Sequence, residues 1–174
     1  MPRNIEIKAR IDSVEALLPL ARALADGPAQ AIAQDDTFFI CAHGRLKLRD
    51  FGDDSGELIH YHRADSTGPK LSDYVRVMTA EPAALREALT RAQGVLGRVC
   101  KQRLLLLIGA TRVHLDCVEG LGDFLEIEVV LRDDQTVAEG QAIADALLAR
   151  LGVPASQRLA GAYLDLLLTA GAAR

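Results

Sequence analysis

The amino-acid sequence predicts an α+β protein, built as a closed, mostly antiparallel, eight-stranded β-barrel with flanking helices. Eight segments have the alternation of apolar and polar residues that is typical of β-strands. The segments between and after them carry helix caps and stop signals. With 174 residues, the chain is long enough for one domain, spanning 1–174, and too short for two. Eight strands also suffice to close a small barrel.

The first half of the chain begins with a strand, because isoleucines alternate with polar and charged residues over residues 4–11. A helix is then expected to start at Asp12, which forms a capping-box pattern with Glu15, and to stop before Gly27. Three more strands complete this half, over residues 37–42, 45–49 and 57–64.

The second half is predicted to repeat this order. A strand over 70–79 precedes a helix that opens at Pro82 and ends at Gly94. Three strands follow, over residues 98–108, 111–118 and 124–131. Two helices are expected last, one from the Thr136 cap to Gly152 and one over residues 159–169. The order strand, helix, three strands therefore occurs twice, which is a weak internal repeat.

Composition bounds the partners and the location of the protein. A formal net charge of -4 argues against a binder of nucleic acid polymers, which usually carries a basic excess. The three cysteines form neither a CxxC pair nor an even framework, which indicates a reducing compartment. The N-terminus is charged, and no apolar run approaches the roughly 20 residues of a membrane span. We therefore expect a cytoplasmic protein without membrane segments.

Charged residues on the polar strand faces are sorted by sign. Basic residues gather on two strands and acidic ones on two later strands: Arg45, Lys47, Arg49, Lys101 and Arg103 against Asp116, Glu126 and Glu128. Like charges two residues apart lie only about 7 Å apart on one strand face, and a solvated face usually mixes both signs. An open sheet with solvated faces is one explanation of the pattern. A cavity for a triphosphate with divalent cations is another, because phosphates bind Arg and Lys while the cations bind carboxylates.

These residues resemble the hallmarks of the CYTH superfamily of triphosphate tunnel metalloenzymes. The family's N-terminal Glu-x-Glu-x-Lys strand is represented by Asn4, Glu6 and Lys8, with asparagine at the first acidic position. The alternating basic strand over 45–49, the later Lys-x-Arg pair and the acidic hairpin over 115–128 follow in the family's order. The similarity covers nearly the whole chain, and the Gly-Leu-Gly hairpin is most similar to the class IV adenylyl cyclase branch.

The resemblance implies a role for each charged group. Mg²⁺ or Mn²⁺ would be held by four carboxylates: Glu6, Asp116, Glu126 and Glu128. The substrate phosphates would be bound by six basic residues: Lys8, Lys47, Arg49, Arg63, Lys101 and Arg103. The catalytic residues would be Lys8, Asp116 and Glu128. A small-molecule triphosphate as substrate, and a homodimer, are expected on the same basis.

The implied activity is that of a divalent-metal-dependent phosphohydrolase acting on a nucleoside triphosphate, thiamine triphosphate or inorganic triphosphate. Two alternatives stay open. If a ribose 3′-hydroxyl rather than water is the nucleophile, the protein is a class IV adenylyl cyclase that converts ATP to cyclic AMP and pyrophosphate. If neither attacks, it is a non-catalytic binder of nucleotides or polyphosphate, for which Asn4 is the indication in the sequence.

Overall fold

The computed structural model describes residues 3–62 and 73–171, which form an α+β fold with nine strands and four α-helices. The strands are β1 (Arg3–Arg10), β2 (Gln30–Phe39), β3 (Arg45–Asp50), β4 (Gly56–His62), β5 (Asp73–Thr79), β6 (Val95–Ile108), β7 (Thr111–Val118), β8 (Gly122–Leu131) and β9 (Arg158–Leu159). The helices are α1 (Val14–Leu24), α2 (Pro82–Gln93), α3 (Val137–Arg150) and α4 (Tyr163–Ala170). The predicted repeat is confirmed in the order of these elements, since β1-α1-β2-β3-β4 is followed by β5-α2-β6-β7-β8.

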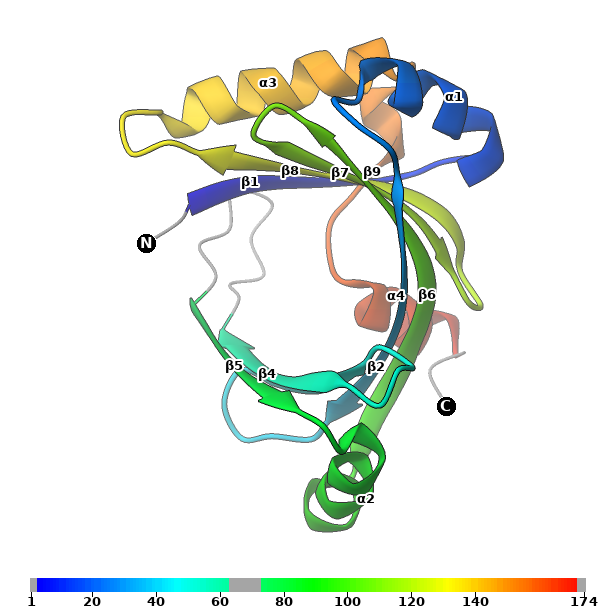
Figure 1. Cartoon of the computed structure of the whole chain (residues 1–174), viewed down its shortest axis with the longest axis vertical. Helices are drawn as coiled ribbons and strands as arrows, with labels where there is room; N and C mark the ends of the chain where they lie inside the picture. The colour runs from blue at the N-terminus through cyan, green and yellow to red at the C-terminus, as the bar shows by residue number, and fades with distance from the viewer. Residues whose placement is uncertain (1–2, 63–72, 172–174) are drawn as a thin grey trace.

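All nine strands belong to one antiparallel sheet with the order β5-β4-β3-β2-β6-β7-β8-β1-β9. The sheet curves strongly around a central space, and α1, α2 and α3 lie on its outer side (Figure 1). The predicted α+β class is thus confirmed, but the predicted closed barrel of eight strands is not. Within the described ranges the sheet ends on β5 and β9, because β9 pairs with β1 at Lys8 and Ala9, where a closing strand would have to bind.

The main core lies between the outer face of the sheet and two helices. Strands β1, β7 and β8 turn their apolar side chains outward, where α1 and α3 cover them. Gly140 allows the close approach of α3, since a Cβ atom there would overlap a methyl carbon of Leu131. Burial of this face at about 25 cal/mol per Å² of apolar area is the principal stabilising contribution. Because the apolar residues point outward, the alternating polar residues of the same strands point into the space that the sheet surrounds.

Helix α4 lies on the inner side of the curved sheet, unlike the other three helices (Figure 1). Its residues Tyr163, Leu164 and Leu167 are at most 6% exposed and form a second apolar cluster with residues of the sheet such as Phe38 and Phe124. The first residues of α4 therefore line part of the space that the sheet surrounds. Among the described residues, no helix has the length and apolar character that crossing a membrane requires.

Candidate active site

The concave side of the sheet holds a cavity of about 400 Å³, lined by residues of the eight strands β1 to β8 and by the start of α4. Within the described residues, the basic groups of its wall are Lys8, Lys47, Arg49, Arg76, Lys101, Arg103 and Arg112. The acidic groups are Glu6, Asp36, Glu57, Glu126 and Glu128. A volume of this size is within the range of small-molecule sites. The high density of charge indicates a strongly charged ligand.

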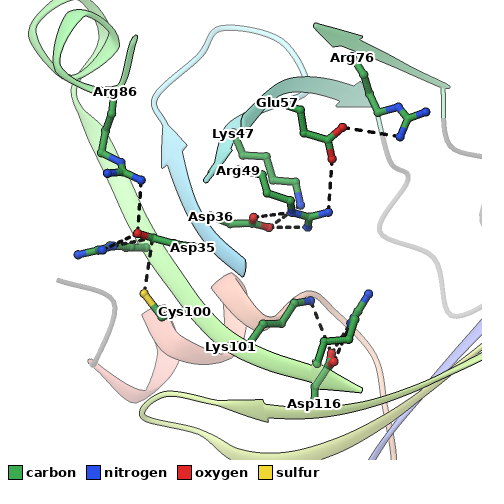
Figure 2. Close-up of polar contacts among 12 residues, drawn as sticks. Asp35, Asp36, Lys47, Arg49, Glu57, Arg76, Arg86, Cys100, Lys101 and Asp116 are labelled. Carbon is green, nitrogen blue, oxygen red and sulfur yellow. Dashed lines mark hydrogen bonds and ion pairs between the residues drawn. The ribbon is translucent and has the colours of Figure 1, made fainter. Parts of the chain in front are cut away.

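Asp36 of β2 organises the basic residues of β3. Its carboxylate accepts hydrogen bonds from Lys47 Nζ at 2.7 Å and from Arg49 Nε and Nη2 at 2.7 and 2.8 Å (Figure 2). The geometry follows from the sheet, because Asp36 pairs with Arg49 in the β2-β3 register and Lys47 lies two residues along the same face. Burial alone would raise the pKa of Asp36, but Lys47 and Arg49 hold this pKa well below its ordinary value. The carboxylate is therefore permanently charged.

Glu57 of β4 extends this cluster toward the edge strand. It lies opposite Arg49 in the register, with 3.7 Å between Arg49 Nη1 and Glu57 Oε1, and its other oxygen is 3.7 Å from Arg76 Nη1 (Figure 2). These ion pairs are longer than hydrogen bonds. A phosphate oxygen could therefore bind Arg76 or the Nη1 atom of Arg49 without first breaking a short contact, whereas Nε and Nη2 of Arg49 are bonded to Asp36.

A second cluster is centred on Arg103 of β6. The Arg103 guanidinium binds Asp116 bidentately, with both distances 2.7 Å, and also donates to Glu126 at 2.9 Å. Lys101 Nζ lies 3.5 Å from Asp116. Burial, together with the neighbouring charge of Arg103, lowers the pKa of Lys101 to about 8. Lys101 thus remains mostly charged at neutral pH, and Arg103 is fixed by carboxylates on two strands.

The acidic wall is formed by β1 and β8. Glu6 lies directly opposite Glu128 in the register of these strands, and Lys8 lies opposite Glu126. Like charges at opposite positions repel one another, since their Cβ atoms are about 5 Å apart. Two donors moderate the repulsion at Glu128, namely Asn4 Nδ2 at 2.6 Å and Arg112 Nη1 at 3.3 Å.

The donors on this wall fit a hard divalent cation in their chemistry, because Mg²⁺ and Mn²⁺ prefer carboxylate oxygens. Glu6, Glu126 and Glu128 supply such oxygens from neighbouring positions of two strands. They are not preassembled, however: in the part of the chain that the structure describes, no three acidic, histidine or cysteine side chains are already grouped as a metal site. Arg103, Arg112 and Asn4 occupy oxygens of Glu126 and Glu128 instead.

The structure brings together eight of the predicted site residues on the cavity wall: Glu6, Lys8, Lys47, Arg49, Lys101, Arg103, Glu126 and Glu128. Asp116 is placed differently. It is fully buried behind Arg103, and its oxygens accept hydrogen bonds from Arg103 and from the Tyr163 hydroxyl. Its predicted role as a metal ligand stays a prediction. Arg63, the sixth predicted phosphate-binding residue, lies outside the described residues.

Four charged residues of the wall were missed by the sequence-based prediction, namely Asp36, Glu57, Arg76 and Arg112. Asp36 precedes the strand expected over 37–42, whereas β2 begins at Gln30. The sequence does carry a signal: Gln34, Asp36 and Phe38 share one face of the longer strand, and all three are at most 8% exposed. Asp36 therefore continues the inward face that Phe38 indicates.

Comparison with known proteins places this arrangement in a family. A CYTH domain profile matches residues 2–163 of the chain. The chain belongs to the CYTH family. The resemblance drawn from the sequence is thereby confirmed, and CYTH proteins are generally enzymes that act on triphosphates, with divalent metals as their typical cofactors.

Solved structures support the CYTH fold. The PH1012 protein of Pyrococcus horikoshii is 23% identical, with a TM-score of 0.80, over 94% of this chain and 98% of its own. A candidate adenylate cyclase of Vibrio parahaemolyticus is 16% identical, with a TM-score of 0.73, over 95% and 98%. HpAC1 of Hippeastrum, described as a candidate adenylyl cyclase with a dominant triphosphatase activity, is 18% identical, with a TM-score of 0.70, over 98% and 96%. At these identities the likeness shows the fold alone. No curated protein matches the chain in sequence.

Proposed function

We propose that this CYTH protein is a divalent-metal-dependent phosphohydrolase that acts on a triphosphate-bearing substrate: a nucleoside triphosphate, thiamine triphosphate or inorganic triphosphate. The observation that carries the proposal is the cavity wall, where seven basic side chains face five carboxylates among the described residues. Such a wall suits a ligand that combines several negative phosphates with a cation. The proposed site closes around the ligand as a tunnel, as the family resemblance implies.

The basic residues would bind and orient the phosphates. Arg49 and Arg103 can grip phosphate oxygens bidentately, while Lys47 and Lys101 supply point charges. All four are largely buried, so that each interaction with a phosphate is stronger than it would be in water. Their charges would also neutralise the negative charge that spreads over the transferred phosphoryl group.

The carboxylates of β1 and β8 would hold the metal. Glu6, Glu126 and Glu128 are the proposed ligands, and a bound Mg²⁺ or Mn²⁺ would polarise phosphate oxygens as a Lewis acid. Binding requires that phosphate oxygens replace Glu126 at Arg103, since these two side chains are now joined at 2.9 Å. Asp116 would not need to move. It would keep Arg103 in place through the two remaining hydrogen bonds, and Lys8 would bind a phosphate beside Glu126.

The proposal is tested by incubating the protein with ATP, thiamine triphosphate or tripolyphosphate and Mg²⁺ or Mn²⁺, and by resolving the products. Metal-dependent release of orthophosphate is expected. Glu128→Gln should lower turnover by about a hundredfold or more, because it removes a ligand charge and retains the side-chain shape. Glu119→Gln is the matched control, since Glu119 is an exposed glutamate just before the same strand and should leave the rate unchanged.

Three results would contradict parts of this proposal. Formation of cyclic AMP and pyrophosphate from ATP would replace the hydrolase with a cyclase. Tight binding without turnover would leave only a binder of nucleotides or polyphosphate. Full activity of the Glu128→Gln variant would refute the assignment of the metal site.

A further inference from the structure

Tyr163, the first residue of α4, contacts more charged groups of the cavity wall than its place in an apolar cluster requires. The Nζ atom of Lys8 lies over its ring at 4.1 Å from the centroid, and that of Lys101 lies over it at 5.0 Å. Its hydroxyl donates to Asp116 Oδ2 at 2.8 Å. A single side chain therefore touches two lysines of the wall and the carboxylate that fixes Arg103.

We infer that Tyr163 is a positioning residue, whose ring holds Lys8 and Lys101, and whose hydroxyl holds the Asp116-Arg103 pair, ready for the phosphates of the substrate. The phosphates are those of the proposed function, so this part of the inference rests on it. The arrangement of the side chains themselves does not.

The two lysines need such a support because of their places in the sheet. Lys8 is on β1 and Lys101 on β6, with β8 and β7 between them, so that no backbone pairing joins their strands. Each ammonium group ends a flexible side chain of four methylene groups and repels the other. An aromatic ring attracts both through its negative face, and unlike the Asp116 carboxylate, which lies 3.5 Å from Lys101, it neutralises neither charge. The lysines are thereby held in place and remain available to an anion.

Tyr163 is itself firmly placed. Its ring packs edge to face on Phe124, with 5.0 Å between the centroids and an interplanar angle of 61°. Asp165 fixes the start of α4 through two sets of contacts. It accepts a hydrogen bond from the Ala162 backbone, and both its oxygens lie 3.1 Å from Arg45 Nη2 on β3. Helix α4 thus connects the wall formed by β3 with the wall that holds Lys8 and Lys101. These contacts keep the Tyr163 ring in place when a ligand binds in the cavity.

Simple packing is the competing explanation, and the hydroxyl argues against it. Phenylalanine or leucine would fill the same apolar space, whereas a buried hydroxyl must find a partner to repay its desolvation. Burial, and then the nearby carboxylates Glu126 and Asp116, raise the pKa of Tyr163 far above its ordinary value. The hydroxyl therefore stays protonated and acts as a constant hydrogen-bond donor to Asp116.

The inference is tested with three variants and inorganic tripolyphosphate in the presence of Mg²⁺, by calorimetry. Tyr163→Phe keeps the ring and loses only the hydroxyl bond to Asp116, which keeps its two hydrogen bonds from Arg103, so binding should weaken by no more than about threefold. Tyr163→Leu keeps apolar volume without the ring and should bind about tenfold more weakly, as expected for the loss of two partly desolvated cation-π contacts. Leu167→Ala is the packing control, because Leu167 is 2% exposed in the same helix and does not line the cavity. It should lower the melting temperature and leave the affinity unchanged.

A second measurement needs no ligand. In the wild type and in Tyr163→Phe, the ring should shift the ε-methylene proton signals of Lys8 and Lys101 upfield in NMR spectra, and Tyr163→Leu should abolish the shift. Unshifted lysine signals in the wild type, or wild-type affinity in a folded Tyr163→Leu variant, would overturn the inference. If the wild type does not bind tripolyphosphate, the proposed function fails, and the lysine signals still decide whether Tyr163 positions the two side chains.

Discussion

Replacing Asp36 by asparagine should weaken the fold and strengthen phosphate binding at the same time. Asp36 is 3% exposed, and its carboxylate accepts three short hydrogen bonds from Lys47 and Arg49. Removal of one partner from a buried ion pair typically costs about 3–5 kcal/mol, because the remaining charge is left uncompensated. Asparagine still accepts a hydrogen bond. We therefore expect Asp36→Asn to lower the free energy of unfolding by about 3 kcal/mol.

The same substitution frees two cations for the ligand. In the wild type a phosphate must compete with Asp36 for Lys47 and Arg49, whereas in Asp36→Asn it meets no competing carboxylate there. Tripolyphosphate should therefore bind more tightly to the variant. At a concentration of 100 times the Kd, a ligand stabilises the folded state by about 2.7 kcal/mol, so most of the lost stability should return.

Urea unfolding at pH 7, with and without tripolyphosphate, measures both effects. Asp54→Asn is the matched control, since Asp54 is an exposed aspartate on a turn with a φ of 60°, a conformation that asparagine also adopts. Asp54→Asn should change neither the free energy of unfolding nor the affinity for tripolyphosphate. A free energy of unfolding within 1 kcal/mol of the wild type, or weaker binding of tripolyphosphate by Asp36→Asn, would refute the reasoning.

Two further predictions concern single residues. Burial, then the charge of Arg103, lowers the pKa of His114 to about 4 from an ordinary 6.5, so the folded state keeps this ring neutral while the unfolded state takes up a proton. Stability is then fully present above pH 6.5 and is lost as the pH falls toward 4, by about 3 kcal/mol from this group. Urea unfolding from pH 7 to 4 should show a steeper loss for the wild type than for His114→Gln, and equal slopes would contradict the assignment. Asn4→Glu should place a third carboxylate beside Glu6 and Glu128. The variant should be less stable without metal, because the three like charges repel one another, and should bind Mn²⁺ more tightly in a calorimetric titration. Unchanged or weaker Mn²⁺ binding would show that position 4 lies outside the metal site.

The sequence predicted the fold best where the alternation of residue types is strong. The strand over 111–118 was predicted with the bounds that β7 has, and the Thr136 capping box and the Pro82 and Gly94 ends of α2 are confirmed. The first helix is capped by Ser13 rather than Asp12, because Ser13 accepts the backbone hydrogen bond of Ala16. Two polar residues in succession leave such a choice open until the backbone angles are known.

Long-range pairing was harder to predict. Strand β2 starts seven residues before the predicted one, because its first half is mostly exposed, is rich in alanine and glutamine, and is held by pairing with β6 rather than by strand propensity. The last helix begins at Tyr163 rather than near residue 159, since residues 158 and 159 pair with β1. Pairing between segments about 150 residues apart, such as β1 and β9, leaves no periodic signal in either one.

Most charged residues of the candidate site were predicted from the sequence, but the buried residues that hold the basic side chains in place were not. Alternation placed Lys47 with Arg49, and Lys101 with Arg103, on the polar face of their strands. The family resemblance implied that these faces share a cavity, and the structure places all four residues on its wall. The partners that fix them, Asp36 and Tyr163, come from the part of β2 that precedes the predicted strand and from the far end of the chain. Partnerships of this kind depend on how the sheet curves and on where α4 is seated, neither of which the local pattern contains.

The central claim is that the charged cavity binds a triphosphate together with a divalent metal. A crystal structure with tripolyphosphate and Mn²⁺, with the metal located by its anomalous scattering, tests this claim most directly. We predict phosphate oxygens on Lys47, Arg49, Lys101 and Arg103, and an anomalous peak beside Glu6, Glu126 and Glu128. A triphosphate bound on the outer face of the sheet, or a filled cavity with no metal on these glutamates, would contradict it.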